Sequence, residues 1–242
     1  GDIGERSYWK GLRVSGWFIV LFAVTSSTAA WDWIMSIDTH WFSTLFGWYI
    51  FSEWATIGFA SILLLTLLLN RQGYLKHLND SHIHDLGKFV FAFSIVWTYM
   101  WFSQFMLIWY ANIPEEVTYF VTRIEDYPLP FWGMLVTNLI FPFFVLMNSD
   151  YKRVNWLIVM TGIVILFGHY LDFYNMIMPA TVGDQWYIGV PEIGGIMFFT
   201  GLFIYVVFNT ISKVSLETGC LHIGHLELPI FMMCPTQLEH KK

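Results

Sequence analysis

Ionisable side chains that interrupt long apolar stretches are the residues of this sequence best placed to do chemistry. Glu53 lies in one such stretch, and His169 and Asp172 lie about one helical turn apart in another. An ionisable residue inside a membrane-spanning helix is energetically costly and usually faces the bundle interior or a wet cavity. Chains of Asp, Glu and His carry protons through membrane proteins. Proton transfer is therefore the first chemistry that these residues indicate.

Five further polar residues extend the set of proton-path candidates. They are Asp32, His84, Asp85, Lys88 and Gln104. By helical rise, Glu53 lies roughly 16 Å and Asp172 roughly 9 Å from the outer ends of their stretches. If their helices adjoin, the groups would form a graded path from the outer face toward the centre. The alternative for each is a local hydrogen bond that fixes helix packing.

The sequence lacks the patterns that bind common cofactors. The only cysteines are Cys220 and Cys234, so neither a C-x-x-C-H haem motif nor an iron–sulfur ligand set is present. His169 is the only histidine well inside an apolar stretch, which argues against a bis-histidine haem. No phosphate-binding glycine loop occurs. We expect no catalytic residue, no metal ligand set and no cofactor site in this chain.

Aromatic residues leave one further alternative open. Trp97, Trp101 and Trp109 share one apolar stretch and could flank a quinone ring. An aromatic-rich helix more often serves packing, and that is the simpler interpretation.

Composition places the chain in a membrane. Of its 242 residues, 56% are hydrophobic, 20% aromatic and only 12% charged. An average soluble domain is about 45–50% apolar and about 25% charged. The formal net charge of −6 and the absence of a basic stripe exclude a nucleic-acid-binding protein. Two cysteines near the C-terminus exclude a disulfide-stapled secreted module.

Six stretches are long and apolar enough to cross a bilayer, which takes roughly 20 residues each. They are residues 14–35, 42–69, 87–111, 130–148, 155–178 and 190–211. None shows the alternation of a transmembrane β-strand. The sequence predicts an all-α, polytopic transmembrane helix bundle over residues 14–213.

The distribution of Lys and Arg predicts the orientation of the bundle. Nine of these residues lie at one set of helix ends, and Arg123 is alone at the other. Both termini should therefore face the cytoplasm, with residues 1–13 as an N-terminal segment. Residues 214–242 are too short and polar to span again, and we expect a poorly ordered cytoplasmic tail there.

Prolines mark several expected helix ends. Pro114 should stop the third span, and Pro179 should close the fifth, because proline lacks the N–H that continues a helix. Pro191 should open the sixth span within its first turn.

Long stretches of the sequence resemble a known membrane subunit. They are TSSTAAWDWIMSIDTHWFSTLFGWY (25–49), HDLGKFVFAFSIVWTYMWFSQFMLIWYANIPEE (84–116), the LPFWG…FPFFVLMNSDYKR run (129–153) and GHYLDFYNMIMP (168–179). They look like the F-type, NrfD-like integral membrane subunit of alternative complex III, a quinol:cytochrome c oxidoreductase. The resemblance covers about residues 8–213. The family's subunits have more helices, so only their last six are matched, and we expect an N-terminal four-helix portion to precede these residues.

The resemblance implies a bacterial inner-membrane respiratory complex that oxidises menaquinol. In that family haem c and iron–sulfur clusters sit on partner subunits. The implied partners are a sister NrfD-like quinol-binding subunit, an iron–sulfur subunit, multihaem and monohaem cytochrome c subunits, and a terminal oxidase. This chain would be a non-catalytic subunit that braces the quinol-oxidising subunit and supplies a proton path.

Two other functions remain open at this point. A proton-coupled secondary transporter would also carry buried acids, although such proteins often show paired broken helices that are not evident here. The third possibility is that this subunit itself binds quinol.

Overall fold

The computed structural model describes residues 2–75, 78–148, 151, 154–184 and 187–213, and this part of the chain forms helices and no strand. Six helical segments are long and apolar enough to cross a membrane. They are Trp9–Ile37, Phe46–Arg71, Asp80–Ala111, Pro128–Met147, Asn155–Val182 and Val190–Ile211. The predicted all-helical architecture with six spans is confirmed at this level. The tail at 214–242 lies outside the described residues.

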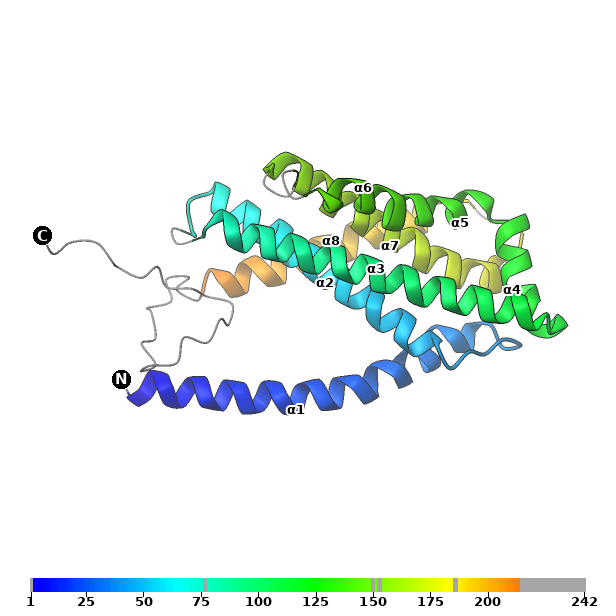
Figure 1. Ribbon diagram of the computed structural model, residues 1–242, viewed down its shortest axis with the longest axis horizontal. Helices are drawn as coiled ribbons and strands as arrows, with labels where there is room; N and C mark the ends of the chain where they lie inside the picture. Colours follow the sequence, from blue (N-terminus) through cyan, green and yellow to red (C-terminus); the bar gives the residue numbers. More distant parts are fainter. Residues whose placement is uncertain (1, 76–77, 149–150, 152–153, 185–186, 214–242) are drawn as a thin grey trace, which may run out of the picture.

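The helices, in chain order, are α1 (Asp2–Trp33), η1 (Met35–Ile37), α2 (Phe46–Arg71), α3 (Asp80–Ala111), α4 (Pro114–Glu125), α5 (Pro128–Leu135), η2 (Val136–Ile140), α6 (Phe141–Met147), α7 (Asn155–Val182) and α8 (Val190–Ile211). In Figure 1, α2, α3, α7 and the span formed by α5, η2 and α6 run side by side, and α4 lies at one end of them. Helix α2 packs against both α3 and α7, and α5 packs against α7. These helices enclose the core.

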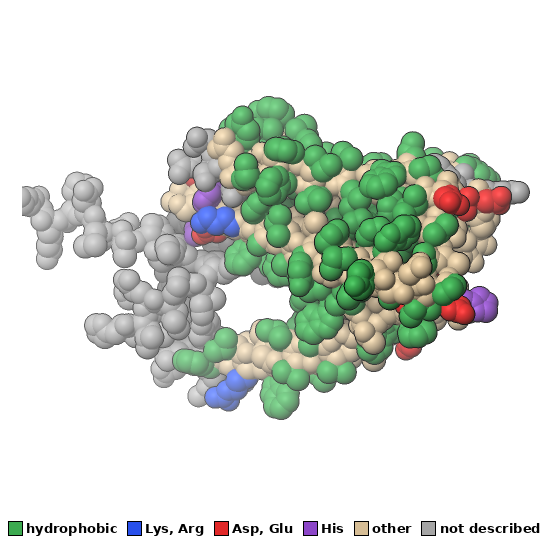
Figure 2. Space-filling view, turned by 45° about the vertical axis from the view of Figure 1, so that its right-hand side comes forward, with side chains coloured by type: hydrophobic (Ala, Val, Ile, Leu, Met, Phe, Trp, Pro, Cys, Tyr) green, Lys and Arg blue, Asp and Glu red, His purple; other side chains and the backbone are tan. Residues whose placement is uncertain are grey.

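The surface has the distribution of side chains that a bilayer requires. Hydrophobic side chains cover the middle of the face shown in Figure 2, whereas charged side chains gather toward its two ends. Apolar residues remain exposed where no other helix covers them, as at Trp17, Phe144 and Phe199. We therefore treat the middle band as the surface in contact with lipid.

Helix α4 was not predicted. Helix α3 ends at Ala111 because Asn112 adopts a left-handed conformation, with φ of 51°. Pro114 does not merely stop the third span, as expected, but begins α4, since proline suits the first turn of a helix. Along α4, Tyr119, Phe120 and Arg123 are buried, so its inner face closes this end of the bundle. This end, which also holds the start of α2 and the end of α7, is called the α4 end below.

The expectation that Pro179 closes the fifth span is wrong. Helix α7 passes through Pro179 and continues to Val182, where Gly183 follows with φ of 65°. Proline cannot donate the hydrogen bond that the carbonyl four residues earlier, on Asn175, would normally accept. The guanidinium of Arg123 donates to that carbonyl instead, at 3.0 Å from Nε. A tertiary contact therefore compensates the local break. Pro191, by contrast, begins α8 in its first turn, as predicted.

The fourth span contains a π-helical turn. Residues Val136–Ile140 form η2, which lies directly before Pro142 near the start of α6. The ring of Pro142 disfavours a regular carbonyl position four residues earlier, on Asn138. The side chain of Asn138 is buried there against Gly168 of α7, where an added Cβ would overlap it.

The first helix contributes two buried residues, Ser26 and Ala30, to the described core, and the last helix contributes none. Helix α1 meets α2 near Ser27, whose side chain lies 3.1 Å from the position a Cβ would take on Gly47, and it diverges from the bundle toward the N-terminus (Figure 1). No residue of α8 is buried. The functional side chains must therefore be sought among α2, α3, α4, α5 and α7.

Candidate functional site

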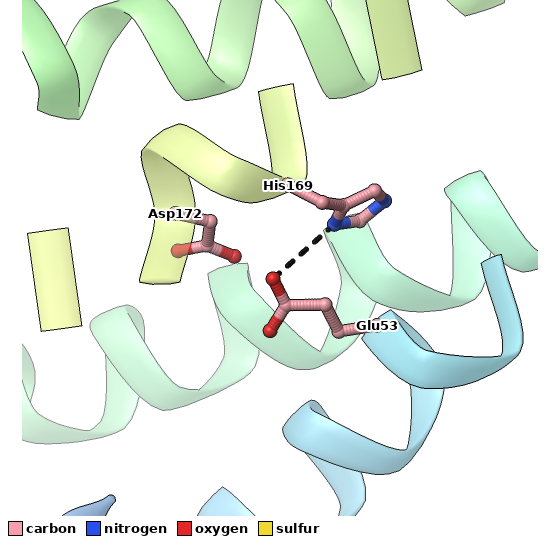
Figure 3. Close-up of side chains that lie close together, drawn as sticks. All are labelled: Glu53, His169 and Asp172. Carbon is pink, nitrogen blue, oxygen red and sulfur yellow. Dashed lines mark ion pairs between the residues drawn. The ribbon is translucent and has the colours of Figure 1, made fainter. Parts of the chain in front are cut away.

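Three ionisable side chains meet in the middle of the bundle. Glu53 of α2 is fully buried, and His169 and Asp172 of α7 are each only 1% exposed. One oxygen or nitrogen atom from each residue lies within 4.8 Å of the others. His169 Nδ1 is 3.4 Å from Glu53 Oε1 (Figure 3). We call Glu53, His169 and Asp172 the buried triad.

Helix geometry and close packing bring the triad together. His169 and Asp172 are three residues apart and therefore share a face of α7. Glu53 reaches them because α7 lies against α2, where Gly162 of α7 leaves room for the side chain of Leu64. A Cβ at Gly162 would come within 3.0 Å of that leucine. The sequence analysis predicted a graded path if these helices adjoin. The structure instead places all three groups in one cluster.

Asp172 is held by two hydrogen-bond donors. The hydroxyl of Tyr49 lies 2.6 Å and 2.5 Å from its two carboxylate oxygens. The indole Nε1 of Trp97 donates to Asp172 Oδ2 at 2.9 Å. Trp97, weighed from the sequence as packing or as a quinone neighbour, therefore also orients this carboxylate. Tyr49 was missed, although it lies four residues before Glu53 on the same face of α2.

The other two members of the triad have free polar atoms. Among the described residues, neither oxygen of Glu53 and neither ring nitrogen of His169 has a hydrogen-bond partner. Buried polar groups in proteins are normally hydrogen-bonded, because an unsatisfied group costs roughly 1–3 kcal/mol. Nδ1 of His169 lies 3.4 Å from Oε1 of Glu53, and two facing groups without hydrogen bonds indicate a site that takes up a cation or a proton.

A small cavity adjoins the triad on the side toward α4. Its lining includes Asp172, Tyr49, Gln104, Asn175 and Arg123, and it has room for about one water molecule. Gln104 Oε1 and Asn175 Oδ1 lack hydrogen-bond partners among the described residues. The cavity thus joins the triad to the polar groups at the α4 end. Of the sequence candidates outside the triad, Gln104 is the one that lines this cavity.

Arg123 forms the far wall of the cavity. It is 2% exposed, and its guanidinium donates to the carbonyls of Tyr119, Asn175 and Met176. It also lies over the ring of Tyr119, 3.2 Å from the centroid, and 3.9 Å from Asp38, which is 28% exposed. Asp38 therefore connects the buried guanidinium to the surface.

Burial governs the ionisation of this end of the molecule. Desolvation lowers the pKa of Arg123 below its ordinary value, and the neighbouring Tyr119 and Asp38 oppose that change. Desolvation likewise raises the pKa of Tyr119 above 10.0, while Arg123 acts in the opposite direction. In the sequence, Arg123 stood out only as the single Lys or Arg at its set of helix ends. That isolation was the signal for a structural role.

The remaining sequence candidates lie away from the triad. Asp32 is exposed on α1. Asp85 and Lys88 are exposed on α3 and form an ion pair with each other at 3.0 Å. His84 precedes Trp97 by thirteen residues on α3, which is roughly 20 Å of helical rise. These four residues are not brought into contact with the buried triad.

No protein-family model matches the chain, and no curated protein matches it.

Proposed function

We propose that this chain is an integral membrane subunit of a quinol-oxidising electron-transfer complex, and that its buried triad carries protons. The subunit would brace the quinol-binding partner, while haem c and iron–sulfur clusters on other subunits carry the electrons. The proposal draws on the resemblance described above and on six helices suited to a bilayer. The single observation that carries the proton role is the triad itself, with Glu53 fully buried and neither of its oxygens hydrogen-bonded to any described residue.

The described contacts supply the part of a route that lies beside the triad. Tyr49 touches Asp172, and the cavity beside them reaches Gln104 and Arg123. A single water in that cavity would lie beside Asp172, Gln104 and Arg123. Arg123 only donates hydrogen bonds, so it would orient this water and would not pass a proton on to Asp38. Toward the opposite end, buried hydroxyls on the same helices continue the polar interior, among them Thr56 on α2.

The subunit assignment is tested by co-purification. An affinity tag on this chain, used in mild detergent on native membranes, should bring down a multihaem c-type cytochrome and an iron–sulfur protein. The readouts are a reduced-minus-oxidised haem spectrum and subunit mass spectrometry. Recovery of the chain without haem or iron would contradict the assignment.

The proton role is tested on the same complex with Glu53→Gln, which keeps the size of the side chain but removes its titration. We expect a lower proton-to-electron ratio in vesicles while the subunit composition stays unchanged. Glu115→Gln makes the same chemical change at an exposed position on α4 and should leave the ratio unaltered. An unchanged ratio in Glu53→Gln would remove the proton role and leave the structural role standing.

A further inference from the structure

The buried triad also has the donor set and spacing of a metal site. We propose that Glu53, His169 and Asp172 bind a divalent transition-metal ion of the Zn²⁺ type. The site is formed by two helices that are distant in sequence, α2 and α7. Ligands from two distant helices form no short motif in the sequence, and the sequence analysis predicted no metal ligands.

The separation of the donors fits coordination better than a hydrogen bond. The 3.4 Å between His169 Nδ1 and Glu53 Oε1 exceeds the usual hydrogen-bond range of about 2.7–3.2 Å. In a tetrahedral site with metal–ligand bonds of about 2.0–2.2 Å, two ligands lie about 3.3–3.6 Å apart. Because all three donors fall within 4.8 Å, Asp172 need move inward by only on the order of 1 Å.

Glu53 Oε1 and His169 Nδ1 face each other across the position where an ion would sit (Figure 3). Within the described part of the chain, these two atoms and the second oxygen of Glu53 have no hydrogen-bond partner. Both residues are at least 99% buried, so bulk water does not satisfy these atoms. A bound metal ion would form bonds to these buried polar atoms, which have no water molecule to bond to in a dry interior.

The surrounding residues support the same interpretation. Tyr49 and Trp97 donate hydrogen bonds to Asp172, as outer-shell groups commonly do for a ligating carboxylate. Two carboxylates neutralise a divalent cation, and a neutral cluster is the least costly charge state in a low-dielectric interior. One imidazole and two carboxylates favour Zn²⁺ over Mg²⁺, which prefers six oxygen ligands and retains several waters.

Binding requires the donors to release their protons. His169 must carry no proton on Nδ1, and both carboxylates must be ionised. Uptake of the ion therefore releases to solvent any protons that the triad held. An ion and a proton therefore exclude each other on these atoms. That the ion would block proton transfer rests on the proposed function, but the binding itself does not.

The test is the metal content of the full chain, purified in mild detergent without a histidine tag and incubated with Zn²⁺ before desalting. We expect about one Zn²⁺ per chain by mass spectrometry of the metal, and a loss of at least tenfold in occupancy at limiting Zn²⁺ in Glu53→Gln and His169→Gln. Zn²⁺ should also raise the thermal midpoint of the wild-type chain and leave that of the variants unchanged.

Two controls separate this site from other metal-binding side chains. His84→Asn removes a histidine from α3. The fivefold variant Cys220→Ser, His222→Asn, His225→Asn, Cys234→Ser and His240→Asn removes the thiols and imidazoles from the segment 214–242. Both variants should keep the ion.

X-ray absorption of the zinc-loaded wild-type chain keeps the test independent of variant folding. We expect one imidazole and only nitrogen or oxygen ligands at about 2.0–2.1 Å. Sulfur ligation, or no stoichiometric ion, would overturn the proposal. Because this experiment needs neither haem nor proton transfer, its failure is distinguishable from failure of the proposed function.

Discussion

Arg123 and Pro179 compensate each other at the scale of single residues. Pro179 leaves the carbonyl of Asn175 without its helical donor, and Arg123 supplies one at 3.0 Å, with a second bond to Met176 at 3.1 Å. A guanidinium can make both contacts at once because its donors form a rigid fork, which a lysine does not offer. The cation at the α4 end of the bundle thus has a structural explanation.

A double-mutant cycle tests this compensation. We expect Arg123→Met to lower the free energy of unfolding by about 2–3 kcal/mol, because buried carbonyls lose charge-assisted hydrogen bonds. In a Pro179→Ala background, residue 179 regains its N–H, and the same change should cost about 1 kcal/mol less. Denaturant unfolding in detergent measures both costs. Strictly additive effects would show that the two residues act independently.

Tyr119 makes a specific prediction for alkaline pH. Burial raises its pKa above 10.0, so in the folded chain it keeps its proton when the unfolded chain has lost it. Stability from this group is therefore complete below pH 10 and is lost as the pH rises above it. Tyr119→Phe should reduce the alkaline slope by up to about 1.4 kcal/mol per pH unit.

Burial lowers the pKa of Arg123 while it raises that of Tyr119, so a control variant is needed. The pKa of Arg123 is lowered, so its own contribution to stability rises with pH in the alkaline range. Tyr110→Phe, at a position 90% exposed on α3, removes a tyrosine without a buried environment. An equal change of slope in both variants would contradict the role assigned to Tyr119.

At the scale of elements, α7 meets the π-helical turn η2 through Gly168. A Cβ there would overlap Asn138 and Thr137, so the two spans are packed at backbone distance. This contact lies directly beside His169 and helps to fix where the triad sits on α7. The packing also explains why a glycine is tolerated in the interior of a spanning helix.

Gly168→Ala should therefore destabilise the bundle by about 1–3 kcal/mol, the usual cost of overpacking. Gly58→Ala is the matched control, because α2 has nothing within 4 Å of the added methyl group, and alanine favours helix over glycine by roughly 1 kcal/mol. We expect opposite signs for the two variants in thermal unfolding. A neutral Gly168→Ala would mean that the two spans are not in close contact.

The sequence predicted the elements better than their ends. Apolar length and composition identified all six spans, and α8 begins and ends where expected. The first and third spans begin earlier than predicted, since α1 starts at Asp2 and α3 at Asp80, so residues 2–13 belong to a helix. Two proline positions also differ, since Pro114 can begin a helix and Pro179 can be bridged by a distant arginine. Neither outcome depends on local propensity, so no pattern along the chain distinguishes them.

The candidate site was predictable in part, because buried ionisable groups stand out in an apolar sequence. Burying an ionisable group in an apolar span is costly enough to single out Glu53, His169 and Asp172 from composition alone. Tyr49 and Trp97 were not singled out for contact with Asp172, because a tyrosine or tryptophan in such a span is unremarkable without its partner. Asp32, Asp85 and Lys88 lie near helix ends, where charged side chains reach water at little cost.

At the scale of the whole molecule, the core of the described bundle does not depend on α8. No residue of α8 is buried, whereas α2, α3 and α7 surround the triad. Deleting residues 190–242 should shift the thermal midpoint of the remaining bundle little, and the zinc site should persist. Deleting residues 2–40 should destabilise it clearly, because Ala30 and Ser26 of α1 are buried and Asp38 contacts Arg123. Equal effects of the two deletions would contradict this division.

The π-helical turn η2 has a consequence for how the length of this chain can vary. A π turn holds one residue more than an α turn. Removing one residue from 136–140 would therefore restore a regular α-helix and leave α6 facing as it does now. The same deletion in the middle of α7 would rotate every later residue by about 100° and separate Asp172 from Glu53. Insertions and deletions between related chains should accordingly fall in the fourth span at η2, while α2 and α7 keep a constant length between their functional residues.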